Sequence, residues 1–125
     1  PSATVETSAA ADAIPELPGI DVELLMTRMK GRRNSVLRLL GLFREQYAGS
    51  AATLLALLEN GNAEELHRFA HTLKGASSSL GAHRLGEFAR QLEAAVEAGE
   101  LATARILADD VNREMEIVLG GLRAL

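Results

Sequence analysis

The stretch NGNAEELHRFAHTLKGASSSLGA, residues 60–82, contains a complete helix together with its start and stop signals. Asn62 is a good N-cap, and Glu64 and Glu65 follow in the first turn, where the helix dipole favours negative charge. Apolar residues then recur every three or four positions, as on a helix with one buried face. Gly81 ends the pattern. This stretch therefore predicts a helix over about 63–79 that buries one side against its neighbours.

The same spacing continues in both directions along the chain. Helical patterns cover about 32–59, 83–98 and 100–119, and a short helix with Asp21 as its N-cap covers about 21–30. A kink near 49–50 is compatible with Gly49, and Gly120 and Gly121 are expected to fray the end of the last helix. Because short turns join the long helices, neighbours should run antiparallel. The pattern predicts an all-α fold, an antiparallel up-down four-helix bundle with a short extra N-terminal helix.

The composition agrees with one helical domain and excludes several other classes. The chain has 125 residues, 47% apolar and 24% charged, and its three Phe, one Tyr and no Trp are too few aromatics for a typical sandwich or barrel. The net charge of −4 argues against binding to nucleic acid, and no apolar run is long enough to span a bilayer, so we expect no direct membrane contact. Cysteine is absent, which excludes disulfides and thiolate metal sites. No signal peptide is recognisable, and we expect a cytoplasmic location.

Residues 1–14 differ from the rest of the chain. They are mostly small and polar without helical periodicity, which predicts a linker or disordered tail followed by a bundle domain over 15–125. The chain begins at Pro1 without an initiator Met. We therefore expect it to be a piece of a longer protein.

One face of the helix over about 63–79 has an unusual composition for an exposed surface. At about 100° per residue, His71 lies almost opposite the centre of the apolar stripe, with Gly75 and Ser78 beside it and Lys74 one turn away. A glycine at such a position costs about 1 kcal/mol relative to alanine. Small residues around a histidine therefore indicate that another protein needs access to the imidazole. A free imidazole is mostly neutral near pH 7 and is then a nucleophile, and Lys74 offers positive charge to a phosphoryl group carried by it.

Residues 70–82, AHTLKGASSSLGA, resemble the signature of the histidine-containing phosphotransfer (HPt) domain. That signature is a histidine, any residue, Leu-Lys-Gly, a run of small residues, an aliphatic residue and a glycine. The resemblance implies a four-helix bundle whose histidine carries phosphate between aspartates of receiver domains. It makes His71 the phosphoacceptor and gives Lys74 the role of stabilising the phosphoryl group. Gly75 and Ser78 would provide clearance for the partner.

The resemblance also implies partners and a context. Receiver domains of a hybrid kinase or a response regulator would dock on this face and contact His67, Arg68, Gly75 and Ser78, while the domain itself stays monomeric. The tail at residues 1–14 resembles the start of a C-terminal HPt module in a bacterial hybrid sensor histidine kinase, a parent protein that can be anchored in the inner membrane. No Gly-rich loop for ATP phosphates is present in the sequence, so we expect no enzyme activity from the domain by itself. It should need no cofactor of its own, because Mg²⁺ is expected on the partner receiver domain.

Two other interpretations remain open. The first is a non-catalytic helical docking or dimerisation adaptor in which His71 is incidental. The second is a metal site built on His67 and His71, which are spaced i, i+4 and would need His83 or a carboxylate as a third ligand. Arg68 and Phe69 occupy the middle of that pair, so the HExxH motif is absent, and we expect no metal site. Replacing His71 by Gln separates carrier from adaptor, since it should abolish phosphotransfer and leave simple docking intact.

Overall fold

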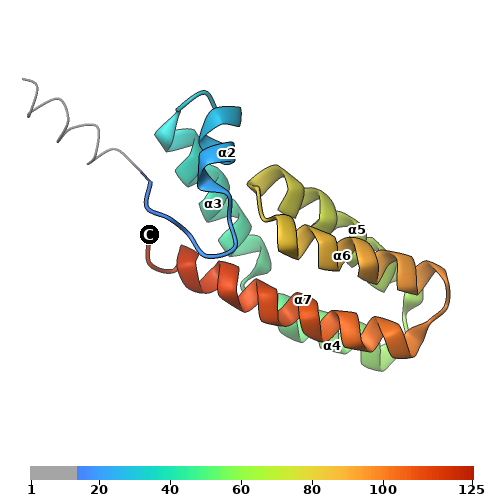
Figure 1. Cartoon of the computed structure of the whole chain (residues 1–125). Helices are drawn as coiled ribbons and strands as arrows, with labels where there is room; N and C mark the ends of the chain where they lie inside the picture. The colour runs from blue at the N-terminus through green and yellow to red at the C-terminus, as the bar shows by residue number, and fades with distance from the viewer. Residues whose placement is uncertain (1–13) are drawn as a thin grey trace, which may run out of the picture.

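The computed structural model describes residues 14–125, and the regular elements in this part of the chain are all helices, which confirms the predicted all-α class (Figure 1). Six helices and no strand occur in the described residues. The helices are α2 (Val22–Arg28), α3 (Arg33–Tyr47), α4 (Ser50–Asn60), α5 (Ala63–Leu80), α6 (His83–Glu97) and α7 (Leu101–Leu122).

The signals read from the sequence at the ends of α2 and α5 are present in the structure. The side chain of Asp21 accepts a hydrogen bond from the backbone N–H of Leu24 at 3.0 Å, and Asn62 accepts one from Glu65 at 3.1 Å. Gly81 closes α5 in the left-handed conformation, with φ of 79°. These caps satisfy backbone groups that a helix end otherwise leaves unpaired. They define the register of α5, the helix that carries the candidate site.

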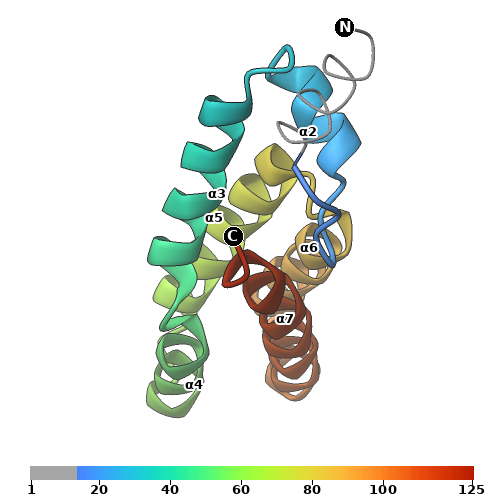
Figure 2. The same ribbon diagram turned by 90° about the vertical axis from the view of Figure 1, so that its left-hand side faces the viewer.

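The pattern over about 32–59 is two helices rather than one, with the break where a kink was expected. Helix α3 ends at Tyr47 and α4 begins at Ser50, and Gly49 between them has φ −105° and ψ 16°, outside the helical region. Glycine favours such a break because it loses more conformational entropy in a helix than any other residue and has a low helix propensity. Ser50 and Leu54 of α4 are buried, so α4 packs on the core through its own buried face. Figure 2 shows α3 and α4 one after the other along one side of the molecule.

The predicted fraying at Gly120 and Gly121 is wrong, since α7 continues to Leu122. The reason is packing against the segment before α2. A Cβ on Gly121 would lie 2.6 Å from Cδ of Pro18, so this glycine permits the close approach of that segment. Leu122 is itself buried and holds the last turn against the core.

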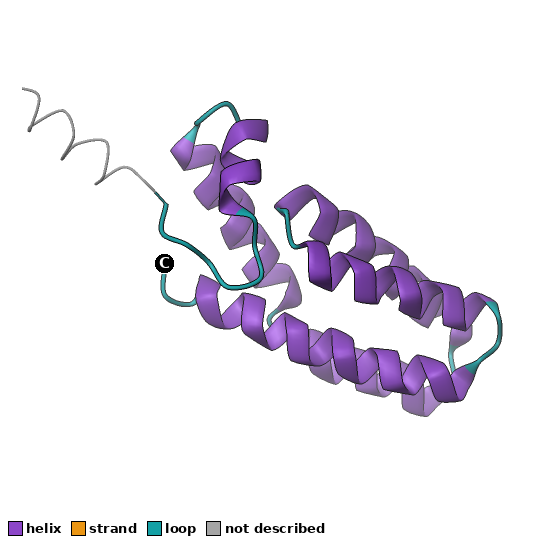
Figure 3. Ribbon diagram, viewed as in Figure 1, coloured by secondary structure: helices purple, strands orange, loops and turns teal. Residues whose placement is uncertain are grey.

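Helices α5 and α6 form a hairpin that packs closely along its length, and α7 packs against α6 (Figure 1). A Cβ on Gly86 would lie 3.4 Å from Cβ of Ser77, so α5 and α6 approach closely there. Buried leucines such as Leu66, Leu73 and Leu92 fill the space between the helices. Short loops join the helices, as Figure 3 shows. This tight hairpin places side chains of α5 and α6 within contact distance of one another.

The predicted linker or tail at 1–14 lies outside the described residues, except for Ile14, which packs half-buried against the core. The division of the chain into a tail and a domain at 15–125 therefore stays a prediction. None of the described helices is long and apolar enough to cross a membrane.

Candidate functional site

The outward face of α5 presents His71 to solvent. Its side chain is 64% exposed, and Gly75 and Ser78 are also exposed along the same face. A Cβ added to Gly75 would meet no atom within 4 Å, so nothing in the fold itself requires glycine there. The structure thus places these three residues together on one open surface, as the helical spacing predicts.

Glu93 of α6 reaches across the hairpin to His71. Its Oε2 lies 2.6 Å from Nδ1 of the imidazole, and its side chain is only 10% exposed. Lys74 donates a hydrogen bond of 2.7 Å from Nζ to Oε1 of the same carboxylate. The two oxygens of one nearly buried carboxylate therefore hold the imidazole and the ammonium group together.

The charge state of Glu93 follows from these contacts. The hydrogen bond from Lys74 is the main cause that lowers the pKa of Glu93 below its ordinary value, burial opposes it, and the hydrogen bond with His71 lowers it further. The carboxylate is ionised at neutral pH and can only accept hydrogen bonds. A proton must then lie on Nδ1 of His71. In the neutral imidazole this leaves Nε2 with a free lone pair.

The second nitrogen of the imidazole, Nε2, belongs to a solvent-exposed ring. Among the described residues, Nε2 of His71 has no hydrogen-bond partner, and the ring is mostly exposed. An imidazole held through one nitrogen and free at the other is prepared for nucleophilic attack through the free nitrogen. The arrangement can therefore accept an electrophilic group from a partner that approaches α5.

His67 lies one turn before His71 and belongs to the same cluster. Its ring is nearly parallel to that of His71, with centroids 6.3 Å apart. Its Nε2 lies 2.7 Å from Oε1 of Glu97 and 3.6 Å from Oε2 of Glu93. His67 therefore stands next to the candidate phosphoacceptor and shares Glu93 with it.

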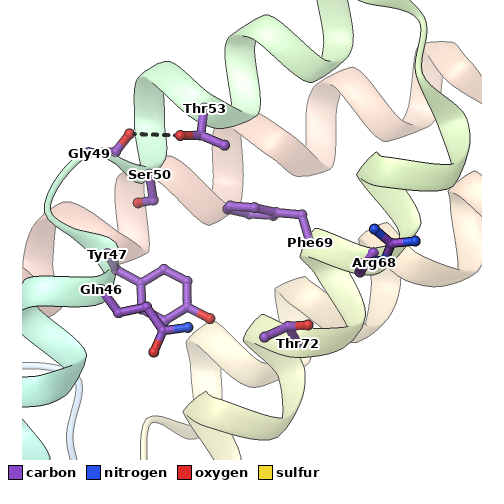
Figure 4. A pocket seen from close by; sticks show the side chains of 8 residues that line it. All are labelled: Gln46, Tyr47, Gly49, Ser50, Thr53, Arg68, Phe69 and Thr72. Atoms are coloured by element: carbon purple, nitrogen blue, oxygen red, sulfur yellow. Dashed lines mark hydrogen bonds between the residues drawn. The ribbon is translucent and has the colours of Figure 1, made fainter.

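Arg68 lies on the opposite flank of α5 and does not join the His71 cluster. It forms an ion pair with Glu65 at 2.7 Å and lines a pocket between α5 and the break between α3 and α4. Figure 4 shows Phe69 and Thr72 of α5 on the side that faces Tyr47 and its neighbours, with Arg68 at the outer edge of this pocket. The full lining is Gln46, Tyr47, Gly49, Ser50, Thr53, Arg68, Phe69 and Thr72.

Ser78 lies further along the outward face, where α2 reaches the end of α5. Its backbone carbonyl accepts a hydrogen bond of 2.8 Å from Arg28. Gly75 and the exposed imidazole stay uncovered by this contact. The open surface of α5 therefore extends from His71 past Gly75 to the Arg28 side chain.

Glu93 and Glu97 are the members of the cluster that the sequence interpretation missed. A signal for Glu93 existed, because it is a carboxylate beside Leu92 and four residues after Ala89, at the edge of the apolar stripe of α6. A charge at such a position needs a partner, since a buried unpaired carboxylate is unfavourable. The partners lie on α5, and only the packing of the two helices identifies them.

These features define a class of protein: an all-helical domain that carries an exposed histidine oriented by a carboxylate of the neighbouring helix. The family model of the Hpt domain matches residues 38–123, more than half of the chain, and the chain belongs to this family. Hpt domains are phosphocarriers rather than catalysts, and they transfer phosphoryl groups through a histidine in phosphorelays, where they interact with receiver domains. The chain has no significant match to a curated protein or to a solved structure.

Proposed function

We propose that His71 accepts a phosphoryl group from the phospho-aspartate of one receiver domain and passes it to an aspartate of another. The observation that carries this proposal is the hydrogen bond between Nδ1 of His71 and the ionised Glu93, which leaves the lone pair of Nε2 free. The exposure of the ring and membership of the Hpt family support it.

In the transfer step, Nε2 attacks the phosphorus in line with the leaving carboxylate. The N–P bond forms as the P–O bond to the aspartate breaks, and the aspartate leaves as a carboxylate. The proton on Nδ1 stays in place, so the imidazole becomes positively charged as the bond forms. Glu93 faces that charge at 2.6 Å and stabilises it, which is electrostatic assistance arranged before the reaction begins. The reverse sequence of bonds passes the group to the next receiver.

Lys74 supports this chemistry from the other side of the carboxylate. Its hydrogen bond keeps Glu93 ionised and fixes the orientation of the carboxylate. The role expected from the family resemblance is direct stabilisation of the phosphoryl group, which requires Lys74 to share its three donors between Glu93 and the phosphoryl oxygens. Both roles place Lys74 in the transfer machinery.

The receiver domain would approach over Gly75 and Ser78, where α5 carries little side-chain bulk. His67 and Arg68 flank this approach on two sides, and the pocket beside Arg68 gives the partner a recess between α5 and the α3–α4 break (Figure 4). We propose that this interface is small and transient, as suits a carrier that exchanges partners. The receiver domain supplies the Mg²⁺.

The wider context is part of the same proposal. We infer that α3 and α4 together form the first helix of an antiparallel up-down four-helix bundle, with α5, α6 and α7 as the others. The domain would act as a monomer in the cytoplasm, as the C-terminal module of a bacterial hybrid sensor histidine kinase. The family assignment supports the phosphorelay, and the resemblance of the tail is the argument for the hybrid kinase.

The test is phosphotransfer from a panel of receiver domains labelled on their aspartates. Wild-type protein should take up an acid-labile, base-stable label, His71→Gln should take up none, and His83→Gln should behave as wild type. His83 is a matched control because it is equally exposed and lies 3.3 Å from a carboxylate of Asp21. Label on His71→Gln would refute the assignment. Binding of receivers without any label on the wild type would instead favour the docking adaptor.

A further inference from the structure

Three metal-ligating side chains meet beside the phosphoacceptor, on the packed faces of α5 and α6. They are His67, Glu93 and Glu97, and one ligand atom from each lies within 4.8 Å of the others. Glu93 and Glu97 are spaced i, i+4, which places both carboxylates on one face of α6 opposite His67. We propose that these three residues bind a divalent transition metal ion, with Zn²⁺ as the best fit, and that the bound ion slows phosphotransfer through His71.

The distances suit a small ion. Zinc in proteins has ligands at about 2.0–2.2 Å in tetrahedral geometry, so its ligand atoms lie about 3.3 Å apart. Nε2 of His67 and Oε2 of Glu93 are already 3.6 Å apart. The 2.7 Å contact between His67 and Glu97 is a hydrogen bond that opens when the ion replaces the shared hydrogen. Water would take the fourth position.

The ligand chemistry favours a transition metal over Mg²⁺ or Ca²⁺. Those two ions prefer oxygen ligands alone, whereas imidazole with carboxylates suits Zn²⁺ and its neighbours. Access is open, because the Glu97 side chain is 62% exposed and that of His67 is 36% exposed. Lys74 holds the second oxygen of Glu93 at 2.7 Å, and such an outer contact orients a ligating carboxylate.

The consequence for His71 follows from one shared atom. Oε2 of Glu93 is the oxygen that accepts from Nδ1 of His71 and the oxygen that faces His67. An ion bound to this oxygen withdraws the electron density that fixes the proton on Nδ1. The preference for a free lone pair on Nε2 then weakens. This second part rests on the proposed function, and we expect the metal to slow phosphotransfer.

Binding itself is tested without any receiver. Titration with Zn²⁺ by calorimetry, and with Co²⁺ by visible absorption, should show one ion per chain. Glu97→Gln and His67→Gln should each weaken binding at least tenfold, while His83→Gln should leave it unchanged and His71→Gln should retain it. Equal loss in His83→Gln, or no binding by the wild type up to millimolar metal, would overturn the site. Loss in His71→Gln with retention in Glu97→Gln would assign the ion to the His67–His71 pair instead and overturn this ligand set.

Regulation is then tested in the phosphotransfer assay. Zn²⁺ should slow the wild type several-fold and leave Glu97→Gln unaffected, which also controls for effects of zinc on the receiver. Equal inhibition of both proteins would refute the regulatory part. If no receiver transfers phosphate to the chain, the proposed function fails, while the metal titration still decides the site.

Discussion

Gly75 is the position at which clearance for a partner can be separated from stability. It lies inside α5, is exposed, and a Cβ there would meet nothing within 4 Å. Gly75→Ala should therefore raise the free energy of unfolding by about 1 kcal/mol, the difference in helix propensity between the two residues. For a domain of this size that corresponds to a rise of about 4 °C in Tm. Urea and thermal unfolding measure both values.

A longer side chain at the same position should keep the fold and obstruct the partner. Gly75→Gln adds bulk without charge one turn from His71, and we expect phosphotransfer from receivers to fall at least tenfold, which corresponds to about 1.4 kcal/mol of lost stabilisation. Gly41→Gln is the matched control, because Gly41 is also inside a helix, α3, with open space at its Cβ. Gly41→Gln should have the same free energy of unfolding as Gly75→Gln and should accept phosphate at the wild-type rate. Transfer by Gly75→Gln at that rate would refute the clearance argument.

Three further predictions concern the carboxylate beside the phosphoacceptor and the packing of α7. Glu93→Gln should lower the free energy of unfolding by about 2 kcal/mol, measured in urea, since it removes the charge that accepts from Lys74 and His71. In the folded protein the pKa of Glu93 is lowered from 4.5, so the carboxylate stabilises the fold above that pH and this contribution is lost as the pH falls below it. The difference in free energy of unfolding between wild type and Glu93→Gln should therefore become smaller in acid. A difference that does not change with pH would contradict the ion pair. Gly121→Ala should lower the free energy of unfolding by about 1–3 kcal/mol, because its Cβ would lie 2.6 Å from Pro18. Gly120→Ala should not lower it, because a Cβ there would meet no atom within 4 Å. Equal shifts in Tm for the two variants would contradict this packing.

The starts of α2 and α5 and the end of α5 were predictable because their causes are local. Asp21 and Asn62 cap the helices that follow them, and Gly81 closes α5, each through contacts within a few residues. The exposed face around His71 was also predictable, since a helix repeats every 3.6 residues and the apolar stripe identifies its buried side.

Features that depend on distant parts of the chain were not predictable. In the sequence, Gly121 predicts the end of a helix. In the structure it lies inside α7 and allows close contact with Pro18, about a hundred residues away. Glu93 lies on a different helix from His71, and its role follows only from the close packing of α5 and α6. The same packing assembles the cluster of His67, Glu93 and Glu97, for which the sequence offers only the i, i+4 spacings.

The most direct test of the account is to identify the nitrogen that carries the phosphoryl group. The protein, labelled on its histidine side chains, would be phosphorylated by a receiver domain and analysed by heteronuclear NMR of the imidazole nitrogens. The account predicts a phosphoryl group on Nε2 of His71, with the proton retained on Nδ1 next to Glu93 and with His67 and His83 unmodified. Phosphorylation on Nδ1 of His71, or on either of the other two histidines, would contradict it.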